Sequence, residues 1–506
     1  MAAALPLVLR LSPADNVVIA RRDLAAGTML ADPALTLRQP IPTGHKLAIA
    51  PIAAGDAIRR YGQIIGFASA AIAPGEHVHA HNVEMRAFAR DNAVGADARP
   101  TAYRDPPVTF QGIRRPDGRV ATRNYLGVVT SVNCSATVAR AIADRMGREL
   151  YGHPVIDGVV PITHNAGCGM APEGEGMDVL RRTIAGYANH PNFAGVLLLG
   201  LGCESNQLAR LAAATGLEES ERLRFATIQD KGGTAATIAW GVDALRAMVP
   251  LAESTRREPV PASALRLALE CGGSDGYSGI TANPALGVAA DLLVANGGTA
   301  ILSETPEIYG AEHLLTRRAA SPAVAEKLMA RIAWWEDYAA RNHGEMNNNP
   351  SPGNKAGGLT TILEKSLGAV AKGGSTNLVD VYGYAEPVTA PGLVFMDTPG
   401  YDPVAVTGQV AGGANVICFT TGRGSVFGAK PAPSIKLATN TPMYERMADD
   451  MDLDCGPVVD GLATVEEKGA EIFDLILRTA SGEPTKSEAL GLGDHEFAPW
   501  IIGATM

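Results

Sequence analysis

Four cysteines stand at or just beyond the ends of apolar segments that have the composition of buried strands. They are Cys134 after GVVTSVN, Cys168 in THNAGCG, Cys203 in GLGCE and Cys271 in ALECGG. Ligands of open α/β sheets bind outside the carboxyl ends of the strands, and thiolates are soft ligands for iron or zinc. At least two of the four are therefore expected to converge on a metal, either one iron ion or an iron–sulfur cluster. The competing interpretation is that cysteine, a small and often buried residue, merely ends these strands.

Histidines provide a second set of candidate ligands. His164 precedes Cys168 by four residues, which favours a ligand or proton-transfer role. In GEHVHAHN, His77, His79 and His81 alternate, so a strand here would place all three on one face. Neighbours on that face lie roughly 6–7 Å apart, so two of them, such as His77 and His79, can share a metal. His45 in PTGHK is a further candidate, and the alternative is a solvated histidine face.

Glycine-rich loops carry carboxylate, amide and cationic side chains in CGGSDGYSGITANP, SETPEIYG, NPSPGNKAGG and TTGRGSVFGAK. Their backbone N–H groups can approach a polyoxygenated anion closely. Candidate substrate contacts from these loops are Ser274, Asp275, Asn354 and Arg423, the last as a bidentate clamp for a carboxylate. Candidate catalytic groups are Lys355, as base or electrostatic clamp, and Glu304 with Glu307, as acid–base groups or hard metal ligands.

Two kinds of element must position these residues. Residues 12–85 contain short β-segments separated by turns such as PTGHK, AAGD and APGE, which predicts a small all-β module. Residues 86–108 are polar and aperiodic, as in a linker. From 109 to 506, continuous apolar strands alternate with helices, which predicts a doubly wound, mostly parallel α/β region. A subdivision near residue 265 is an open alternative.

Composition restricts the class of protein further. The 506 residues are 46% hydrophobic with a net charge of −10, so the chain can bury a large core. No basic run exceeds a pair, which argues against nucleic acid. No apolar stretch reaches the roughly 18–20 residues of a membrane span, and the N-terminus lacks the basic region of a signal peptide. We therefore expect a cytoplasmic enzyme that forms a homo-oligomer such as a dimer.

The motifs together resemble the altronate/galactarate dehydratase family, also called altronate hydrolases, over nearly the whole chain. The β module resembles the SAF domain of that family, a β-clip fold, through DNVVIA, GHKLA, RYGQIIG and GEHVHAHN. The remainder resembles the catalytic region through RNYLG, HNAGCG, GLGCE, ECGGSDGYSGITANP, NPSPGNKAGG and TTGRG. The resemblance implies a hydro-lyase of sugar-acid catabolism that forms a 2-keto-3-deoxy acid and depends on ferrous iron, replaceable by manganese. It adds Arg123 and Asn124 of RNYLG to the candidate substrate contacts.

The substrate stays open between two sugar acids. HVHAHN resembles the altronate branch, whereas TSVNC around Cys134 resembles the galactarate branch, with Asn133 where that branch tends to place a histidine. A related sulfo-lyase is a more distant alternative, because it divides the same fold over two chains. An oxidoreductase would need a dinucleotide fingerprint after the first α/β strand, and VNCSATVAR is not one. A sugar-acid sensor would not need four cysteines at strand ends.

Overall fold

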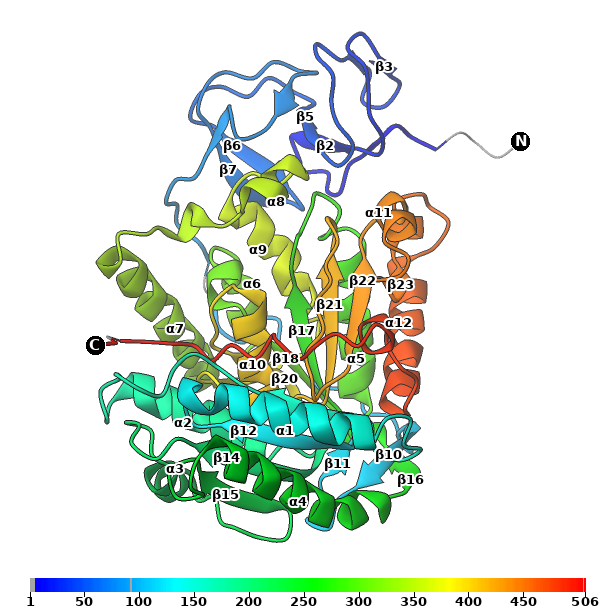
Figure 1. Ribbon diagram of the computed structural model, residues 1–506. Helices are drawn as coiled ribbons and strands as arrows, with labels where there is room; N and C mark the ends of the chain where they lie inside the picture. Colours follow the sequence, from blue (N-terminus) through cyan, green and yellow to red (C-terminus); the bar gives the residue numbers. More distant parts are fainter. Residues whose placement is uncertain (1–4, 92, 504) are drawn as a thin grey trace.

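The computed structural model describes residues 5–91, 93–503 and 505–506, and a small β module lies at one end of two α/β layers (Figure 1). The module contains nine short strands: β1 (Val8–Leu9), β2 (Val17–Ala20), β3 (Met29–Leu30), β4 (Leu35–Thr36), β5 (Lys46–Ala48), β6 (Ala57–Arg60), β7 (Gln63–Ala68), β8 (His77–Val78) and β9 (Val83–Glu84). They form antiparallel sheets ordered β1-β2-β5-β8 and β6-β7-β9, with β3 and β4 as a separate pair. The predicted all-β module is confirmed.

The module packs closely against the rest of the chain. Ile58 and Ile65 are fully buried and belong to a hydrophobic cluster that continues through Leu286 and Leu367 of the α/β region. The predicted linker, residues 86–108, lies along that region without a helix or strand in its described part. It is held there by an ion pair between Arg90 and Glu312 and by backbone bonds along its length. The module is thus packed onto the α/β region, and the linker lies against that region.

The β module is counted as the first layer, and the two α/β layers are called the second and the third. The second layer follows the linker and contains a parallel sheet ordered β13-β12-β14-β15. Its strands are β12 (Tyr125–Thr130), β13 (Gly158–Ile162), β14 (Phe193–Gly200) and β15 (Leu223–Thr227). Its helices are α1 (Ala136–Glu149), α2 (Glu175–Ala188), α3 (Leu208–Thr215) and α4 (Thr234–Glu253). A small antiparallel sheet of β10 (Thr109–Arg114), β11 (Val120–Ala121) and β16 (Arg257–Pro261) connects it to the third layer. Every residue of β12 and β14 is buried, as continuous apolar strands predict.

Helix α4 has 20 residues and is long and apolar enough, by length and composition only, to cross a membrane. In this structure Ile238, Leu245 and Met248 of α4 are buried in one hydrophobic cluster with strand residues of the four-stranded sheet and residues of α1. It is therefore placed as a core helix of the second layer.

The third layer is a parallel seven-stranded sheet ordered β19-β20-β18-β17-β21-β22-β23. Its strands are β17 (Arg266–Cys271), β18 (Thr299–Leu302), β19 (Leu378–Tyr382), β20 (Gly392–Met396), β21 (Val416–Thr421), β22 (Ser434–Ala438) and β23 (Leu453–Asp454). Its helices are α5 (Ala282–Ala295), α6 (His313–Thr316), α7 (Pro322–Arg341), α8 (Pro352–Ala356), α9 (Ile362–Ala371), α10 (Asp402–Ala411), α11 (Thr441–Arg446), α12 (Val465–Ala480) and α13 (Lys486–Ala489).

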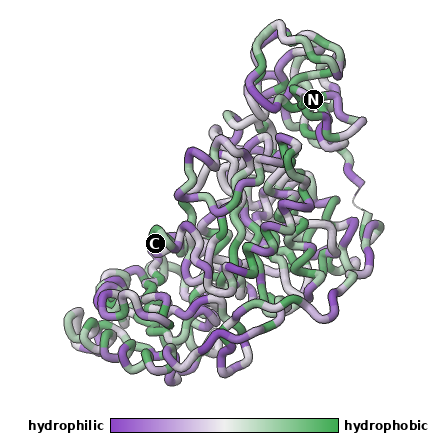
Figure 2. The backbone as a smooth tube through the Cα atoms, turned by 90° about the vertical axis from the view of Figure 1, so that its right-hand side faces the viewer, coloured by the Kyte–Doolittle hydropathy of each residue, from purple (hydrophilic) through white to green (hydrophobic). Residues whose placement is uncertain are grey.

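The two α/β layers share a core in which α2 packs against α10. A β-carbon at Gly186 would lie 2.3 Å from the Ala411 carbonyl oxygen, so glycine allows the two helices to touch. Turned by 90°, the molecule shows the β module at one end, beyond the α/β layers (Figure 2). The predicted α/β class is confirmed, with its strands divided between two separate sheets.

Candidate active site

The histidines of the β module meet at its junction with the third layer. His77 begins β8 and pairs with Leu47 of β5, which places it beside His45, the residue that precedes that strand. β8 ends at Val78, so His79 lies in a turn closed by Asn82, whose side chain accepts from the His79 N–H. The expected strand with three histidines on one face is therefore replaced by a strand end and a turn.

Three imidazoles form a compact group of nitrogen donors. His45, His77 and His79 each offer a ring nitrogen within 4.8 Å of the others, and His45 Nδ1 lies 2.9 Å from His77 Nε2. The rings of His77 and His79 stack with centroids 5.2 Å apart. Burial lowers the pKa of His45, that of His77 to about 3 and that of His79 to about 4, so all three are neutral at pH 7. The Nδ1 atom of His79 is buried without a hydrogen-bond partner among the described residues.

The segment that carries Lys355 passes directly beside this group. His45 Nε2 lies 3.2 Å from the carbonyl oxygen of Ala356, the last residue of α8. A β-carbon on Gly357 would lie 3.0 Å from Asp275 Cβ and 3.3 Å from Arg423 Cδ. Glycine gives room for this close approach, and the structure thereby joins His45 to the loops that carry Lys355 and Arg423.

The predicted loop residues Ser274, Asp275 and Asn354 shape the same region. Asn354 caps α8 together with Ser351 and donates to the Ser274 carbonyl oxygen at 2.9 Å. The buried Asp275 carboxylate accepts from Thr439, Ser278 and the backbone N–H of Tyr277. Burial raises the pKa of Asp275, and these hydrogen bonds oppose the rise. Asn354 and Asp275 therefore fix the loops, while Arg423 stays exposed at their surface.

A buried ion network joins the β module to α9 beside these loops, and it was not predicted from the sequence. The Glu364 carboxylate lies 2.8 Å from Lys46 Nζ and 2.6 Å from Arg60, and all three side chains are fully buried. Lys46 follows His45 directly, and its ammonium also donates to the Gly358 carbonyl oxygen at 2.5 Å. Burial acts to raise the pKa of Glu364, but the two cations outweigh it and lower the value to about 2. The network therefore sets the position of His45.

A second buried cluster lies at the carboxyl ends of β17 and β18, below the loop of Ser274. Cys271 Sγ lies 3.5 Å from a carboxylate oxygen of Glu304 and of Glu307. Lys372 pairs with Glu304 at 2.7 Å, and Lys365 pairs with Glu307 at 2.6 Å. Burial raises the pKa of the Cys271 thiol, which keeps it neutral. The two lysines balance the two carboxylates in charge.

Two features distinguish this cluster from ordinary buried ion pairs: a strained backbone at Glu304 and a raised pKa at Asp402. Glu304 has a left-handed backbone with φ of +67°, which costs about 1–3 kcal/mol in a non-glycine residue. Burial and the charge of Glu304 raise the pKa of Asp402 to about 7. A small cavity lined by Tyr61, Cys271, Ser274, Asp275 and Lys365 lies between this cluster and the loops above it. The lysines and Asp402 carry no recognisable sequence signal because their partners are distant in the chain.

The cysteines divide between the two sheets. Cys134, Cys168 and Cys203 follow β12, β13 and β14, which are adjacent in the four-stranded sheet, and all three are exposed. Cys271 ends β17 in the seven-stranded sheet and is buried, so it does not share an edge with the other three. Cys418 and Cys455 are buried in the third layer.

Three other predicted residues lie away from the histidine group. Arg123 forms a buried ion pair with Glu488 at 2.6 Å. Asn124 accepts from Arg115 and donates to the Val155 carbonyl oxygen. His164 is buried, with Nε2 3.0 Å from the Thr130 carbonyl oxygen and Nδ1 accepting from the Ala166 N–H. In this structure Asn124 and His164 hold the second layer together, and Arg123 joins that layer to α13 of the third layer.

His164 should make stability depend on pH. Burial lowers its pKa to about 4, below the value of about 6.5 in an unfolded chain. Between these values only the unfolded state binds the proton, so the free energy of unfolding falls as pH falls, by at most about 1.4 kcal/mol per pH unit. Urea unfolding of a His164→Asn variant between pH 6.5 and 4.5 should show a shallower slope. The exposed His495, changed to Asn, should leave the slope as in the unchanged chain; equal slopes for both variants would contradict the assignment.

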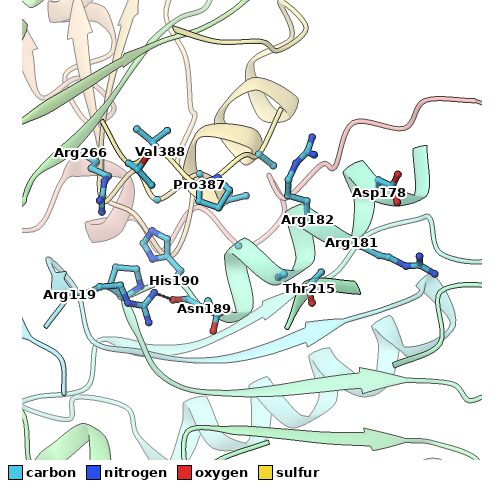
Figure 3. Close-up of a pocket in the computed structure, with 18 of the residues that line it drawn as sticks. Arg119, Asp178, Arg181, Arg182, Asn189, His190, Thr215, Arg266, Pro387 and Val388 are labelled. Atoms are coloured by element: carbon cyan, nitrogen blue, oxygen red, sulfur yellow. Dashed lines mark hydrogen bonds between the residues drawn. The ribbon is translucent and has the colours of Figure 1, made fainter. Parts of the chain in front are cut away.

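A separate cavity of about 880 Å³ opens between the two α/β layers, where Arg119, Arg181, Arg182 and Arg266 line it (Figure 3). The His190 ring in its wall is already bonded, through the Ala414 carbonyl oxygen and the Asn192 N–H. None of the predicted site residues lines this cavity. The candidate active site is therefore the histidine group with the loops of Lys355 and Arg423.

A β module that brings imidazoles to glycine-rich loops of a parallel α/β sheet defines a two-part enzyme site. Comparison with known families matches three models in chain order: "Altronate/galactarate dehydratase SAF domain" over residues 6–86, "D-galactarate dehydratase/Altronate hydrolase, second domain" over 112–253, and "D-galactarate/Altronate dehydratase, C-terminal" over 262–505. The chain belongs to the altronate/galactarate dehydratase family, and it is a sugar-acid hydro-lyase.

Three curated relatives span most of the chain. The altronate dehydratase of Escherichia coli is 37% identical over 97% of this chain and 98% of its own length. The galactarate dehydratase (L-threo-forming) of the same organism is 38% identical, over 94% of each chain. The (2R)-sulfolactate sulfo-lyase subunit beta of Chromohalobacter salexigens is 33% identical over 76% of this chain and 95% of its own.

Proposed function

We propose that this chain is a metal-dependent dehydratase that converts altronate to a 2-keto-3-deoxy acid. The observation that carries the proposal is the group of three neutral imidazoles beside Lys355 and Arg423. The near-complete coverage of an altronate dehydratase supports the choice of substrate. Galactarate is the second candidate, supported by similar identity to a galactarate dehydratase. A cytoplasmic homo-oligomer remains our expectation.

The residues present fit a ferrous or manganous ion. Neutral imidazoles are common ligands of first-row metals. The Nδ1 atom of half-buried His79 is itself buried and has no hydrogen-bond partner among the described residues, so it is available to a metal. The cluster of Cys271, Glu304 and Glu307 fits less well, because Lys365 and Lys372 already neutralise its carboxylates. We therefore assign the ion to His45, His77 and His79.

Loss of a hydroxyl group beside a carboxylate has two requirements. Charge that develops on the carboxylate as the α-proton leaves must be stabilised, and the departing hydroxyl must be protonated. A bound divalent ion supplies Lewis acidity at this position. Arg423 binds the carboxylate through its planar guanidinium, and N–H groups of the surrounding glycine-rich loops add donors. Lys355 Nζ, carried by α8 next to the His45 contact, takes the α-proton as an amine and returns it as an ammonium to the departing hydroxyl, which leaves as water.

Changing Arg423 to lysine should lower kcat/KM at least tenfold, about 1.4 kcal/mol, because an ammonium keeps the charge and loses the bidentate geometry. Steady-state kinetics on the iron-loaded enzyme measure the effect. Arg446→Lys, at an exposed position on α11, is the matched control and should retain full activity. An unchanged kcat/KM for Arg423→Lys would exclude Arg423 as the carboxylate ligand.

The function itself is tested by anaerobic assay of the purified chain with ferrous iron. We expect keto-acid formation from altronate at a kcat/KM well above that from galactarate. Faster turnover of galactarate would reassign the substrate within the family. If neither acid reacts while the metal is bound, the proposed function is wrong.

A further inference from the structure

The exposed thiols of the second layer are not used by the site described above. We refer to Cys134, Cys168 and Cys203 as the cysteine triad. Each follows one of three adjacent parallel strands, in the spatial order β13, β12, β14, so the three leave the sheet at one edge. Cys134 lies in the turn that leads into α1, where the helix dipole favours negative charge.

Hydrogen bonds between residues next to the triad show that its three loops touch. The Asn133 N–H donates to the Ala166 carbonyl oxygen at 3.0 Å, and the Asn133 side chain donates to the His164 carbonyl oxygen at 3.1 Å. The Asn206 N–H donates to the Gly167 carbonyl oxygen, and its side chain to the Ser131 carbonyl oxygen, both at 3.1 Å. These bonds join the loops of Cys134, Cys168 and Cys203 to one another.

Glycine makes this contact possible. Gly167, which precedes Cys168, has φ of +97°, and a β-carbon there would lie 2.3 Å from the Ser131 carbonyl oxygen. Any side chain at this position would separate the loops of Cys134 and Cys168. Glycine at position 167 therefore lets the loops that carry Cys134 and Cys168 lie in direct contact.

The side chains that could complete a single-ion site are already engaged. Glu204, beside Cys203, accepts through one carboxylate oxygen from Ser131 and Leu201 and through the other from the Gly202 N–H. Both ring nitrogens of His164 are bonded to backbone. Within the described chain, the three sulfurs do not all lie within 4.8 Å of one another, as ligands of one ion must. A closed tetrahedral zinc site needs four protein ligands around one ion. The triad offers three thiols that are spaced more widely, with neither Glu204 nor His164 free as a fourth ligand, and this arrangement suits an iron–sulfur cluster better.

We propose that the cysteine triad binds a [4Fe–4S] cluster through three thiolates, with its fourth iron free of a protein ligand. Each thiol loses its proton on ligation. The buried guanidinium of Arg181, which donates to the Asn206 side chain at 3.3 Å, contributes positive charge near the loops. The cluster is distinct from the ion assigned to the histidines, because the triad belongs to the four-stranded sheet and the histidines to the β module.

The test is reconstitution of the whole chain with ferrous iron and sulfide without oxygen, followed by analysis of bound sulfide and by spectroscopy. The unchanged chain should retain about four acid-labile sulfides, with broad visible absorption that bleaches on reduction and a paramagnetic signal in the reduced state. Cys134→Ser, Cys168→Ser and Cys203→Ser should each lose most of the sulfide and the signal. Circular dichroism and thermal unfolding of each variant establish that it is folded.

Two controls separate this proposal from the proposed function. Cys455→Ala removes a buried thiol elsewhere and should retain the cluster. His77→Ala removes a ligand of the other ion and should also retain it, whether or not altronate is the substrate. Sulfide content that is unchanged in folded triad variants would overturn the proposal. One zinc ion per chain without sulfide, or a disulfide within the triad and no metal, would overturn it as well.

Discussion

A His77→Ala variant is expected to lose more than 100-fold in turnover together with its binding of ferrous iron. Its imidazole is one of three that supply donor atoms within 4.8 Å, and alanine leaves only two. Changes to residues that merely support metal ligands already cost about 10–100-fold in affinity or activity, so loss of a ligand should cost more. Anaerobic equilibrium dialysis with ferrous iron and steady-state kinetics measure the two losses.

The matched control is His495→Ala, at an exposed position outside the site, which should bind iron and turn over substrate normally. Iron that belongs to the cluster proposed for the cysteine triad is measured through the labile sulfide in the same samples and subtracted from the total bound iron. Full turnover by His77→Ala would refute a metal role for this histidine group.

A Glu364→Gln variant is expected to lose about 3–5 kcal/mol of stability. The change removes the one carboxylate that pairs with both Lys46 and Arg60, which are fully buried, and breaking a buried pair leaves uncompensated charge. Because the network joins the β module to α9, its loss should also loosen the junction at His45. Urea unfolding measures the stability, and limited proteolysis within residues 86–108 reports separation of the module.

Glu326→Gln is the control for this change, because Glu326 is exposed on α7 and such substitutions usually alter stability by less than about 0.5 kcal/mol. The carboxyl pKa of Glu364 is about 2 in the folded chain, below the ordinary value of 4.5. The contribution of ionised Glu364 to the free energy of unfolding is therefore present above pH 4.5 and lost as pH falls toward 2. Equal stability of the two variants at pH 7 would contradict the role of the network.

The general architecture could be predicted because it depends on local patterns. Turn-rich β-segments and continuous apolar strands each predict their own element, and both elements occur. Membership of a sheet is not local, however. Cys271 follows an apolar strand and precedes glycines as Cys168 and Cys203 do, yet β17 pairs with β18 and β21 in a separate sheet.

The same limit applies to the site. The loop residues Lys355, Asp275 and Arg423 could be proposed from their glycine-rich surroundings, and the structure brings their loops together. The partners that hold them could not. The local sequence predicts that Lys46, at the start of a strand, faces solvent. In the structure it is buried against Glu364, which is 318 residues away in the chain and therefore gives no local signal. The alternation of His77 and His79 predicts one strand face, whereas His77 begins β8 and His79 lies in the turn that follows Val78.

Anomalous diffraction at the manganese edge, from crystals of the manganese-loaded protein, tests most directly whether the catalytic ion binds to the three histidines. Manganese, a hard ion, can replace ferrous iron at imidazole nitrogen and has little affinity for thiolates, so the cysteine triad should not interfere. One strong anomalous peak is expected, bonded to ring nitrogens of His45, His77 and His79. A peak located instead among Cys271, Glu304 and Glu307, with none at the histidines, would contradict this assignment.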